Sequence, residues 1–364
     1  MSNPTDIHAA ADLLISIRDL RREGLDYRDI SARIKGRQLL RLRQGWYVAH
    51  EVWEGMPASS QQLLAIAAAR AEAQAVPVFS HVSAATLLGL PVWSDWLRRI
   101  NGRNDAQRGD PVLPRIVDIT TRKNATTSSS RLLRRHCTDL PASEIDALDG
   151  LRITSRDRTL IDLARTEPFG ILLVCADILL QRDFLVRRTV DAEGLEAWRQ
   201  AMLHYAERHP GAPGMPAVRT VSRIADPRSE SPLETMSRLR LLQLGIDVDL
   251  QTRILLPDSS SAYLDFVFLG RGIFGEADGK AKYTDKDLAK GLTAEEIVYL
   301  EKRRHELISG VSGMRGVRWG APEVETAAHF LKRMVAFGID VPGRPTTSYG
   351  PDTARFLGGL YGAL

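Results

Sequence analysis

The spacing of apolar residues near the N-terminus predicts two helices followed by a hairpin. Apolar side chains recur at helical intervals over residues 7–23, which indicates an amphipathic helix. Asp26 is then placed to cap a short second helix over residues 27–35. Two short apolar and basic runs lie on either side of Gln44–Gly45, so we expect two strands joined by a turn over residues 39–48.

This order of elements is the one expected of a winged helix-turn-helix domain, here over residues 1–55. In such a domain the second helix approaches a DNA groove and the hairpin contacts phosphate. The DNA-binding candidates are therefore the basic residues of these elements, Arg28, Arg37, Arg41 and Arg43. The alternative is that Arg41 and Arg43 only keep an exposed edge hairpin solvated, as charged side chains often do.

We expect a mixed α/β central domain over residues 56–208, because helical and strand-like patterns alternate there. The expected helices cover residues 59–74, 80–88, 155–165 and 171–181, and the expected strands cover 115–120 and 151–154. His81 stands in this domain without a nucleophile at a recognisable spacing. We therefore interpret it as a capping or core histidine rather than a catalytic one.

Proline and glycine mark the expected boundaries of the remaining parts. A chain of 364 residues is too long for one core, so several domains are expected. Residues 209–228 are rich in both residue types and predict a linker. A C-terminal domain over 229–340 and a loosely attached tail over 341–364 follow. The predicted fold class is a multidomain combination of α+β and α/β parts.

Charge and composition change this picture only locally. Hydrophobic residues make up 44% of the chain and charged residues 26%, as in an ordinary globular protein. The formal net charge is only +4, but basic residues concentrate in 18–43 and 98–135. Such local excess favours an acidic partner such as DNA. For the stretch 98–135, a domain interface is an equally open interpretation.

The cysteines and the apolar runs indicate the cellular setting in which the protein is expected to work. Cys137 and Cys175 lie far apart without paired Cys or His spacing, so we expect no zinc site and a reduced, cytoplasmic setting. The first twenty residues carry several aspartates and no long apolar core, so we expect no signal peptide. The longest apolar run, 170–180, is too short to span a bilayer, and no membrane partner is expected.

The C-terminal domain is predicted to open with a helix that places a carboxylate in its first turn. Ser231 suits an N-cap, and Pro232 suits the first helical position. Glu234 then lies where the helix dipole favours negative charge. Its structural alternative is the reciprocal half of a capping box with Ser231, and both roles are compatible.

Two further strands are predicted over 261–269 and 272–278, with a type II′ turn at Gly270–Arg271. In that register Asp265 lies directly opposite Glu276, and directly paired residues share one face with Cβ atoms about 5 Å apart.

Asp278 falls on the same face as Glu276, two residues further along the strand. The other face is expected to turn toward a core, and it carries Leu264, Phe266 and Phe268.

Carboxylates that share one sheet face repel each other, and a divalent cation would offset that repulsion. Mg²⁺ prefers one or two carboxylates together with waters and a substrate phosphate. The pattern therefore favours a Mg²⁺ site at Asp265 and Glu276. The alternative is a pair of solvated edge-strand acids beside Lys280 and Lys282.

Several spaced motifs over residues 229–320 resemble one known family. They are Ser231-Pro232-Leu233-Glu234, the hairpin with Asp265, the run Glu276-Ala277-Asp278-Gly279-Lys280-Ala281-Lys282-Tyr283, and Glu301-Lys302-Arg303-Arg304. Together they resemble the endonuclease-like domain related to very-short-patch repair enzymes, in the PD-(D/E)xK superfamily. The resemblance implies a mixed sheet flanked by helices, with Asp265 and Glu276 as metal ligands assisted by Glu234.

One position departs from that family's pattern. The resemblance implies a lysine two residues after the second-strand acid, and this chain has Asp278 there. Lys280, Lys282 or Lys302 would then supply the positive charge at the phosphate. Without such a lysine, the domain would bind DNA without cutting it.

The N-terminal region has a resemblance of its own. The run Arg41-Leu42-Arg43-Gln44-Gly45-Trp46-Tyr47-Val48 resembles the winged-helix domain of AbiEi-type antitoxins, which are DNA-binding autorepressors of type IV toxin–antitoxin systems. Residues 150–162 resemble a segment from the middle of the same group. There we expect Arg158 and Asp162, four residues apart on a helix, to form an ordinary ion pair. A cognate toxin is the partner that this resemblance implies.

Two functions follow from these patterns. The first is a Mg²⁺-dependent DNA endonuclease positioned by a winged helix, with Glu234, Asp265, Glu276, Asp278, Lys280 and Lys302 as candidate catalytic residues. The second is a non-catalytic transcriptional regulator or antitoxin that retains the nuclease fold. Asp278 in place of lysine favours the second function, and the retention of both Asp265 and Glu276 favours the first.

Overall fold

The chain divides into two compact units, each assembled from separate segments. The structure is a computed structural model that describes residues 3–102, 115–121, 129–278 and 293–360. The first unit contains 1–175 and 211–215, and the second contains 176–210 and 216–364. The chain therefore passes between the units after residues 175, 210 and 215. Two of these points lie within the predicted linker 209–228, and the third lies inside the expected central domain 56–208.

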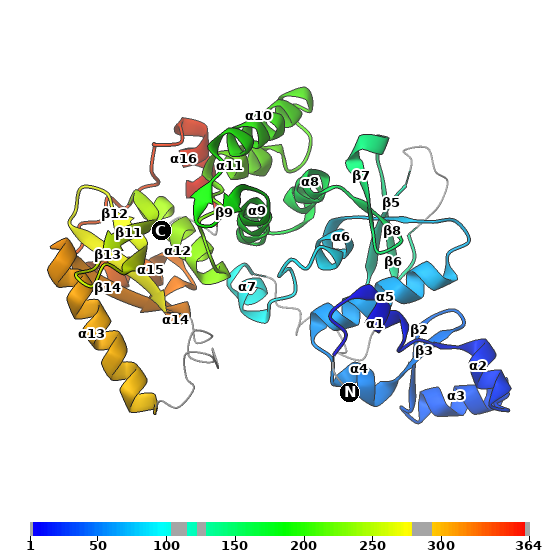
Figure 1. The fold of residues 1–364 in the computed structure, drawn as a ribbon. Helices are drawn as coiled ribbons and strands as arrows, with labels where there is room; N and C mark the ends of the chain where they lie inside the picture. The colour runs from blue at the N-terminus through cyan, green and yellow to red at the C-terminus, as the bar shows by residue number, and fades with distance from the viewer. Residues whose placement is uncertain (1–2, 103–114, 122–128, 279–292, 361–364) are drawn as a thin grey trace. The chain divides into compact units, whose positions relative to one another are not determined.

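The first unit opens with short helices and a small sheet (Figure 1). Its elements are α1 (Ile7–Ala11), β1 (Ile15–Ser16), α2 (Ile17–Arg22), α3 (Tyr27–Lys35), β2 (Leu39–Arg43) and β3 (Trp46–Ala49). The strands pair in the order β1-β3-β2, and both pairs are antiparallel.

Local capping decides where two of these helices begin. The single helix expected over 7–23 is wrong, because the chain becomes extended at Ile15 and pairs with β3. Ser16 then caps α2 through a capping box with Asp19. For α3 the expectation is confirmed: the Asp26 carboxylate accepts the amide hydrogens of Arg28 and Asp29 at 2.6 and 2.9 Å.

The rest of the first unit surrounds a mixed sheet. Its elements are α4 (His50–Glu54), α5 (Ala58–Glu72), β4 (Val78–Phe79), α6 (His81–Leu87), α7 (Asp95–Ile100), β5 (Val117–Thr121), β6 (Leu133–Cys137), η2 (Ala142–Glu144), β7 (Ile145–Leu148), β8 (Leu151–Thr154) and α8 (Arg156–Thr166). The strand order is β6-β5-β4-β8-β7. Three of the expected helices and the first expected strand appear as α5, α6, α8 and β5, within two residues of the predicted bounds, and β8 coincides with its prediction. The other elements of this sheet region were not predicted.

The second unit combines a helical part with another mixed sheet. Its elements are the end of α9 (Phe169–Phe184), β9 (Leu185–Val186), β10 (Thr189–Val190), α10 (Ala192–Arg208), α11 (Met215–Ile224), α12 (Pro232–Leu244), β11 (Val248–Leu255), β12 (Ser261–Phe268), β13 (Ile273–Asp278), α13 (Ala294–Ser312), β14 (Arg315–Gly320), α14 (Ala321–Val324), α15 (Ala327–Ala336) and α16 (Pro351–Gly358). The order β11-β12-β13-β14 is antiparallel except for the parallel pair β13–β14.

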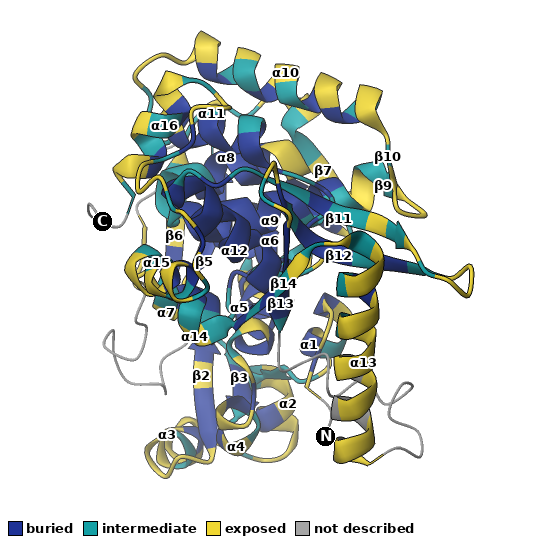
Figure 2. Ribbon diagram, turned by 90° about the vertical axis from the view of Figure 1, so that its left-hand side faces the viewer, coloured by how far each residue is buried: buried dark blue, intermediate teal, exposed yellow. Residues whose placement is uncertain are grey.

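Helices cover both faces of this sheet. Trp319 of β14 donates its indole hydrogen to Ser237 of α12 at 2.8 Å and packs edge-on against Phe330 of α15. On the opposite face, Phe274 of β13 contacts His305 of α13. Figure 2 shows α12 buried along its length, while α13 is largely exposed. The carboxylate-bearing hairpin β12–β13 is thus held between the two helical layers.

Most of two segments expected to lie outside the domains belongs to the second unit, although residues 211–215 of the predicted linker belong to the first. Within the predicted linker 209–228, α11 buries Val218, Val221 and Ile224. In the predicted loose tail 341–364, the Thr346 hydroxyl donates to Asp247 at 2.8 Å, and α16 buries Leu357. The prolines and glycines mark ends of helices there, while apolar residues between them still pack.

No helix in the described part of the chain is both long enough and apolar enough to cross a lipid bilayer.

Candidate nucleic-acid interface and carboxylate site

Three of the four predicted DNA contacts are exposed, on α3 and on the chain that follows it. Arg28 is exposed in the first turn of α3, and Arg37 is exposed in the turn before β2, with a φ of 53°. Arg41 is exposed on β2. The structure therefore leaves these three predicted DNA contacts at the surface, on consecutive elements.

Arg43 differs from this expectation because it is engaged inside the first unit. Its side chain is only 11% exposed, and its guanidinium forms an ion pair with Glu72 of α5 at 2.5 Å. A second nitrogen donates to the carbonyl oxygen of Leu132 at 3.2 Å. The cause is an irregular register between Arg41 and Arg43, which removes the alternation that would place both on one face. Arg43 thus anchors the hairpin to α5.

The hairpin β12–β13 has the register expected from the sequence but a different turn. Phe266 pairs with Gly275 and Phe268 with Ile273, and one further step places Asp265 opposite Glu276. The Arg271 amide donates to the Phe268 carbonyl at 3.2 Å, so the turn is centred one residue earlier than predicted.

Glycine explains this turn. Gly270 and Gly272 both adopt positive φ values, 70° and 59°, which other residues disfavour. The loop therefore bends at both glycines, and the predicted two-residue type II′ turn is replaced without a change in strand register.

Asp265 lies where both neighbouring strand ladders are interrupted. Its carboxylate accepts the backbone amide hydrogen of Ala277 at 3.0 Å, beyond the last paired residues of β12 and β13. On the other side, the pairing of β11 with β12 omits Gln251, which stands opposite Asp265 with a φ of 50°. The Asp265 carboxylate is thus directed at the β13 backbone between Glu276 and Asp278.

This interruption also changes which side chains share a face. All three apolar residues of the predicted core face are buried. Phe266 and Phe268 contact Trp319, but Leu264 belongs to a cluster with Phe274 and Ile308. The predicted single face is therefore wrong, because the strand alternation does not continue past Asp265.

Glu276 is buried and is paired with a cation that the sequence reasoning missed. Arg318 of β14 stands beside it in the parallel ladder and forms an ion pair with its carboxylate at 2.6 Å. The same guanidinium lies 3.9 Å from Asp278. His305 Nδ1 is 3.8 Å from the Glu276 carboxylate. The expected repulsion between Glu276 and Asp278 is therefore offset by Arg318.

The lysines expected at this site are not the groups that reach it among the described residues. Lys302 is 75% exposed, and its ammonium lies 4.0 Å from Glu306, one turn further along α13. His305 is the residue of α13 directed at Glu276. Lys280 and Lys282 lie outside the described residues, and so does Tyr283.

Glu234 lies in the first turn of α12 as expected, but its carboxylate accepts the amide of Glu230, one residue before the N-cap amide that a capping box uses. Its carboxylate accepts the Ser231 hydroxyl at 3.0 Å and the Glu230 amide at 2.9 Å, which stabilises the start of α12. Gln251 donates its side-chain amide to the same carboxylate at 3.4 Å. Glu234 is therefore linked to the residue opposite Asp265.

Metal binding remains a prediction for this carboxylate site, which we define as Glu234, Asp265, Glu276 and Asp278. The described residues contain no group of three or more His, Cys, Asp or Glu side chains arranged to hold a metal ion. Asp265 and Glu276 nevertheless offer hard oxygen donors on neighbouring strands, which fits the preference of Mg²⁺ for one or two carboxylates.

A basic groove lies beside Gln251. Its cavity, about 290 Å³ in volume, is lined by residues from β9 to β11 that include Arg188, Arg228 and Arg253. Arg188 pairs with Glu230 at 2.7 Å and donates to Gln251 at 3.1 Å. Glu230 and Asp249 line the same groove. They form ion pairs with Arg188 and Arg228, so the arginines beside Gln251 are largely balanced by acidic partners.

A polar cluster is buried in the first unit around His81. Its ring stacks on His136 with centroids 3.5 Å apart, and its Nδ1 lies 2.9 Å from the Ser80 hydroxyl. Burial is the main cause that lowers the pKa of His81 to about 2. The expectation of a core histidine is confirmed.

The ion pair expected in this part of the chain is also present. Arg158 donates to Asp162 at 2.9 Å, four residues along α8, and it contacts Glu144 as well. Burial raises the pKa of Asp162, although the neighbouring Arg158 guanidinium opposes the shift.

No known protein-family model matches this chain, and no curated protein sequence matches it significantly.

Proposed function

We propose that this chain binds DNA through α3 and the β2–β3 hairpin. The observation that carries the proposal is the order α1–β1–α2–α3–β2–β3 with the sheet β1-β3-β2, which matches the arrangement of a winged helix-turn-helix. In this arrangement α3 is the recognition helix and the hairpin is the wing.

The exposed charges support the same role. Arg28 lies at the N-terminal end of α3, the end that contacts base edges in this class of domain. Arg37 and Arg41 follow it on the turn and on the wing, where guanidinium groups contact phosphate. These phosphate contacts position the domain on DNA without selecting its sequence.

Fluorescence anisotropy with a labelled DNA duplex, repeated over a series of salt concentrations, tests this proposal. Arg41→Gln should weaken binding and flatten the slope of log affinity against log salt by about one unit. Arg43→Gln should lower the melting temperature, because it breaks the ion pair with Glu72. Arg152→Gln, at an exposed position of β8, is the matched control. An Arg41→Gln variant with wild-type affinity and slope would refute the wing assignment.

A second candidate function is Mg²⁺-dependent cleavage of DNA by the second unit. The observation that favours it is the order α12–β11–β12–β13–α13–β14, with β14 parallel to β13, around neighbouring Asp265 and Glu276. This order supports the resemblance to the PD-(D/E)xK superfamily. Asp265 and Glu276 would hold Mg²⁺, which when bound offsets charge on the scissile phosphate.

The ion pair between Arg318 and Glu276 favours the alternative function. In that case the protein is a regulator or antitoxin that retains the nuclease fold but does not cleave DNA. Arg318 already neutralises Glu276, so a cation at that carboxylate competes with a guanidinium 2.6 Å away. An antitoxin of this kind would also have a cognate toxin as partner.

Plasmid cleavage in Mg²⁺ or Mn²⁺ separates the two functions. Cleavage that is lost in Asp265→Asn and Glu276→Gln, but kept in the exposed control Asp258→Asn, would support the nuclease. Absence of cleavage in the wild type, together with intact duplex binding, would support the regulator. Equal cleavage by all variants would exclude the carboxylate site as its source.

A further inference from the structure

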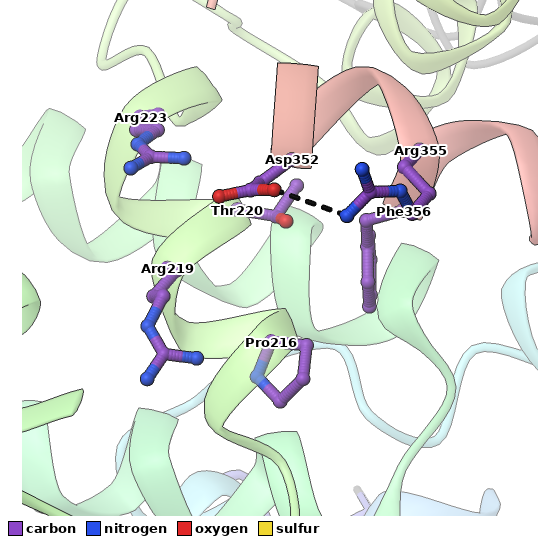
Figure 3. A pocket seen from close by; sticks show the side chains of 7 residues that line it. All are labelled: Pro216, Arg219, Thr220, Arg223, Asp352, Arg355 and Phe356. Atoms are coloured by element: carbon purple, nitrogen blue, oxygen red, sulfur yellow. Dashed lines mark hydrogen bonds and ion pairs between the residues drawn. The ribbon is translucent and has the colours of Figure 1, made fainter. Parts of the chain in front are cut away.

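A second basic cavity lies between α11 and α16, and none of its lining residues belongs to the carboxylate site. Its volume is about 430 Å³. It is lined by Pro216, Arg219, Thr220, Arg223, Asp352, Arg355 and Phe356. Figure 3 shows Arg219 and Arg223 on α11, with Arg355 and Phe356 on α16 across the opening.

Positive charge dominates this lining. Three arginines line the cavity, and Asp352 is the one acidic residue among its described lining residues. Asp352 already accepts a hydrogen bond from Arg355 at 3.2 Å. Arg219 and Arg223 are four residues apart on α11, a spacing at which like charges repel each other. A bound anion would relieve this repulsion.

The two arginines of α11 are positioned by neutral acceptors. Arg219 donates to the Ala206 carbonyl at 3.1 Å, and Arg223 donates to the Thr353 hydroxyl at 3.2 Å. These bonds hold each guanidinium in place, and neither acceptor carries a charge. Guanidinium groups held in this way suit phosphate oxygens, which accept charge-assisted hydrogen bonds.

The remaining lining residues point to a ligand larger than phosphate alone. Phe356 and Pro216 add an aromatic ring and an aliphatic ring beside the arginines. The volume falls in the range of roughly 300–1,000 Å³ that small-molecule sites occupy. Aromatic side chains stack on nucleobases, and arginines bind their phosphates.

We propose that this cavity binds a nucleotide, with its phosphate on Arg219, Arg223 and Arg355 and its base against Phe356. The ligand is a phosphorylated nucleoside, either free or at the 5′ end of a DNA strand. This site is independent of the duplex contact that we propose for α3 and the β2–β3 hairpin.

Isothermal titration calorimetry on the full chain tests the cavity with four probes. We expect dAMP to bind, inorganic phosphate to bind more weakly, and deoxyadenosine not to bind measurably. A short 5′-phosphorylated oligonucleotide distinguishes the two forms of the ligand. If it binds more tightly than dAMP, the ligand is the 5′ end of a DNA strand; if it binds more weakly, the ligand is a free nucleotide. Arg41→Gln should leave dAMP binding unchanged, which separates this site from the duplex contact.

Variants identify the residues responsible. Arg355→Gln changes a side chain that is 82% exposed, so it should fold normally and weaken dAMP binding at least about tenfold. Arg219→Gln combined with Arg223→Gln should abolish binding, and Phe356→Leu should remove the preference for dAMP over phosphate. Arg344→Gln, exposed and outside the cavity, is the charge-matched control. Failure of both dAMP and the oligonucleotide to bind at millimolar concentration, or wild-type affinity in both arginine variants, would overturn the proposal.

Discussion

His81 is a residue whose chemistry is set by its surroundings. The backbone holds it at a φ of 51°, directly after Ser80, and its side chain is buried against His136. Desolvation penalises the charged imidazole, and the neighbouring cations add to that penalty. The folded protein therefore keeps His81 neutral at pH values where a free histidine is protonated.

The first prediction is a loss of stability on acidification that His81 causes. The unfolded chain protonates this histidine near pH 6.5, whereas the folded protein keeps it neutral down to about pH 2. The stabilisation that comes from keeping His81 neutral is therefore fully present above pH 6.5, and it is lost as the pH falls below that value. Between pH 7 and pH 5 we expect a loss of about 2 kcal/mol.

Urea denaturation of wild type, His81→Asn and His8→Asn at both pH values measures this effect. Asparagine tolerates the positive φ, so His81→Asn should fold and lack this part of the pH dependence. His8 is exposed in α1, and His8→Asn should behave like the wild type. An unchanged pH dependence in His81→Asn would show that other groups cause it.

At the scale of elements, α13 and β14 complete the carboxylate site from outside the predicted hairpin. His305 of α13 passes over Gly316 of β14 to reach Glu276. A Cβ added at Gly316 would lie 2.1 Å from the His305 ring and 2.5 Å from Phe274. Glycine is therefore required for α13 to pack this closely on the sheet.

The second prediction concerns this close approach. Gly316→Ala should destabilise the protein by about 1–3 kcal/mol, because the added methyl group overpacks a filled interface. Gly310→Ala is the matched control: Gly310 is exposed on α13, nothing lies within 4 Å of an added Cβ, and alanine is the better helix former. The midpoint of denaturant-induced unfolding measures the stability of both variants. Equal midpoints for the two variants would mean that α13 adapts its position on β14.

The sequence could predict the β12–β13 hairpin, but it could not predict which side chains of α13 and β14 join it at the carboxylate site. A short antiparallel turn allows pairing to be counted, so Asp265 could be placed opposite Glu276 from the sequence. The β13–β14 pair is parallel and is connected through α13, so no count of residues sets its register. Arg318 and His305 were missed for this reason.

At the scale of the whole molecule, a buried ion pair joins helices of the second unit that are far apart in the sequence. Asp177 of α9 accepts from Arg238 of α12 at 2.6 Å and from the Asp226 amide at 2.9 Å. Burial raises the pKa of Asp177, and the Arg238 guanidinium opposes that shift. The segment 176–210 is thereby fastened to residues 216–364.

The third prediction is that Arg238→Met destabilises the second unit by about 3–5 kcal/mol, because an unpaired carboxylate then remains buried. Asp177→Asn in the Arg238→Met background should recover part of the loss, since the amide oxygen still accepts from Asp226. Asp352→Asn, which removes an exposed pair, should have no measurable effect. Hydrogen exchange should locate the lost protection in α9 and α12, and uniform loss along the chain would contradict this assignment.

The sequence by itself determined the local elements of this protein. Asp26 sets the start of α3, Ser231 and Pro232 set the start of α12, and the β12–β13 register follows from a short turn. In each case the interacting residues are close together in the chain.

Only the tertiary structure decided which side chains complete each site. It turned Arg43 toward Glu72, placed Arg318 rather than a described lysine beside Glu276, and packed α11 and α16 into the second unit. These outcomes depend on the positions of segments far apart in the chain, which hydrophobic spacing alone does not specify.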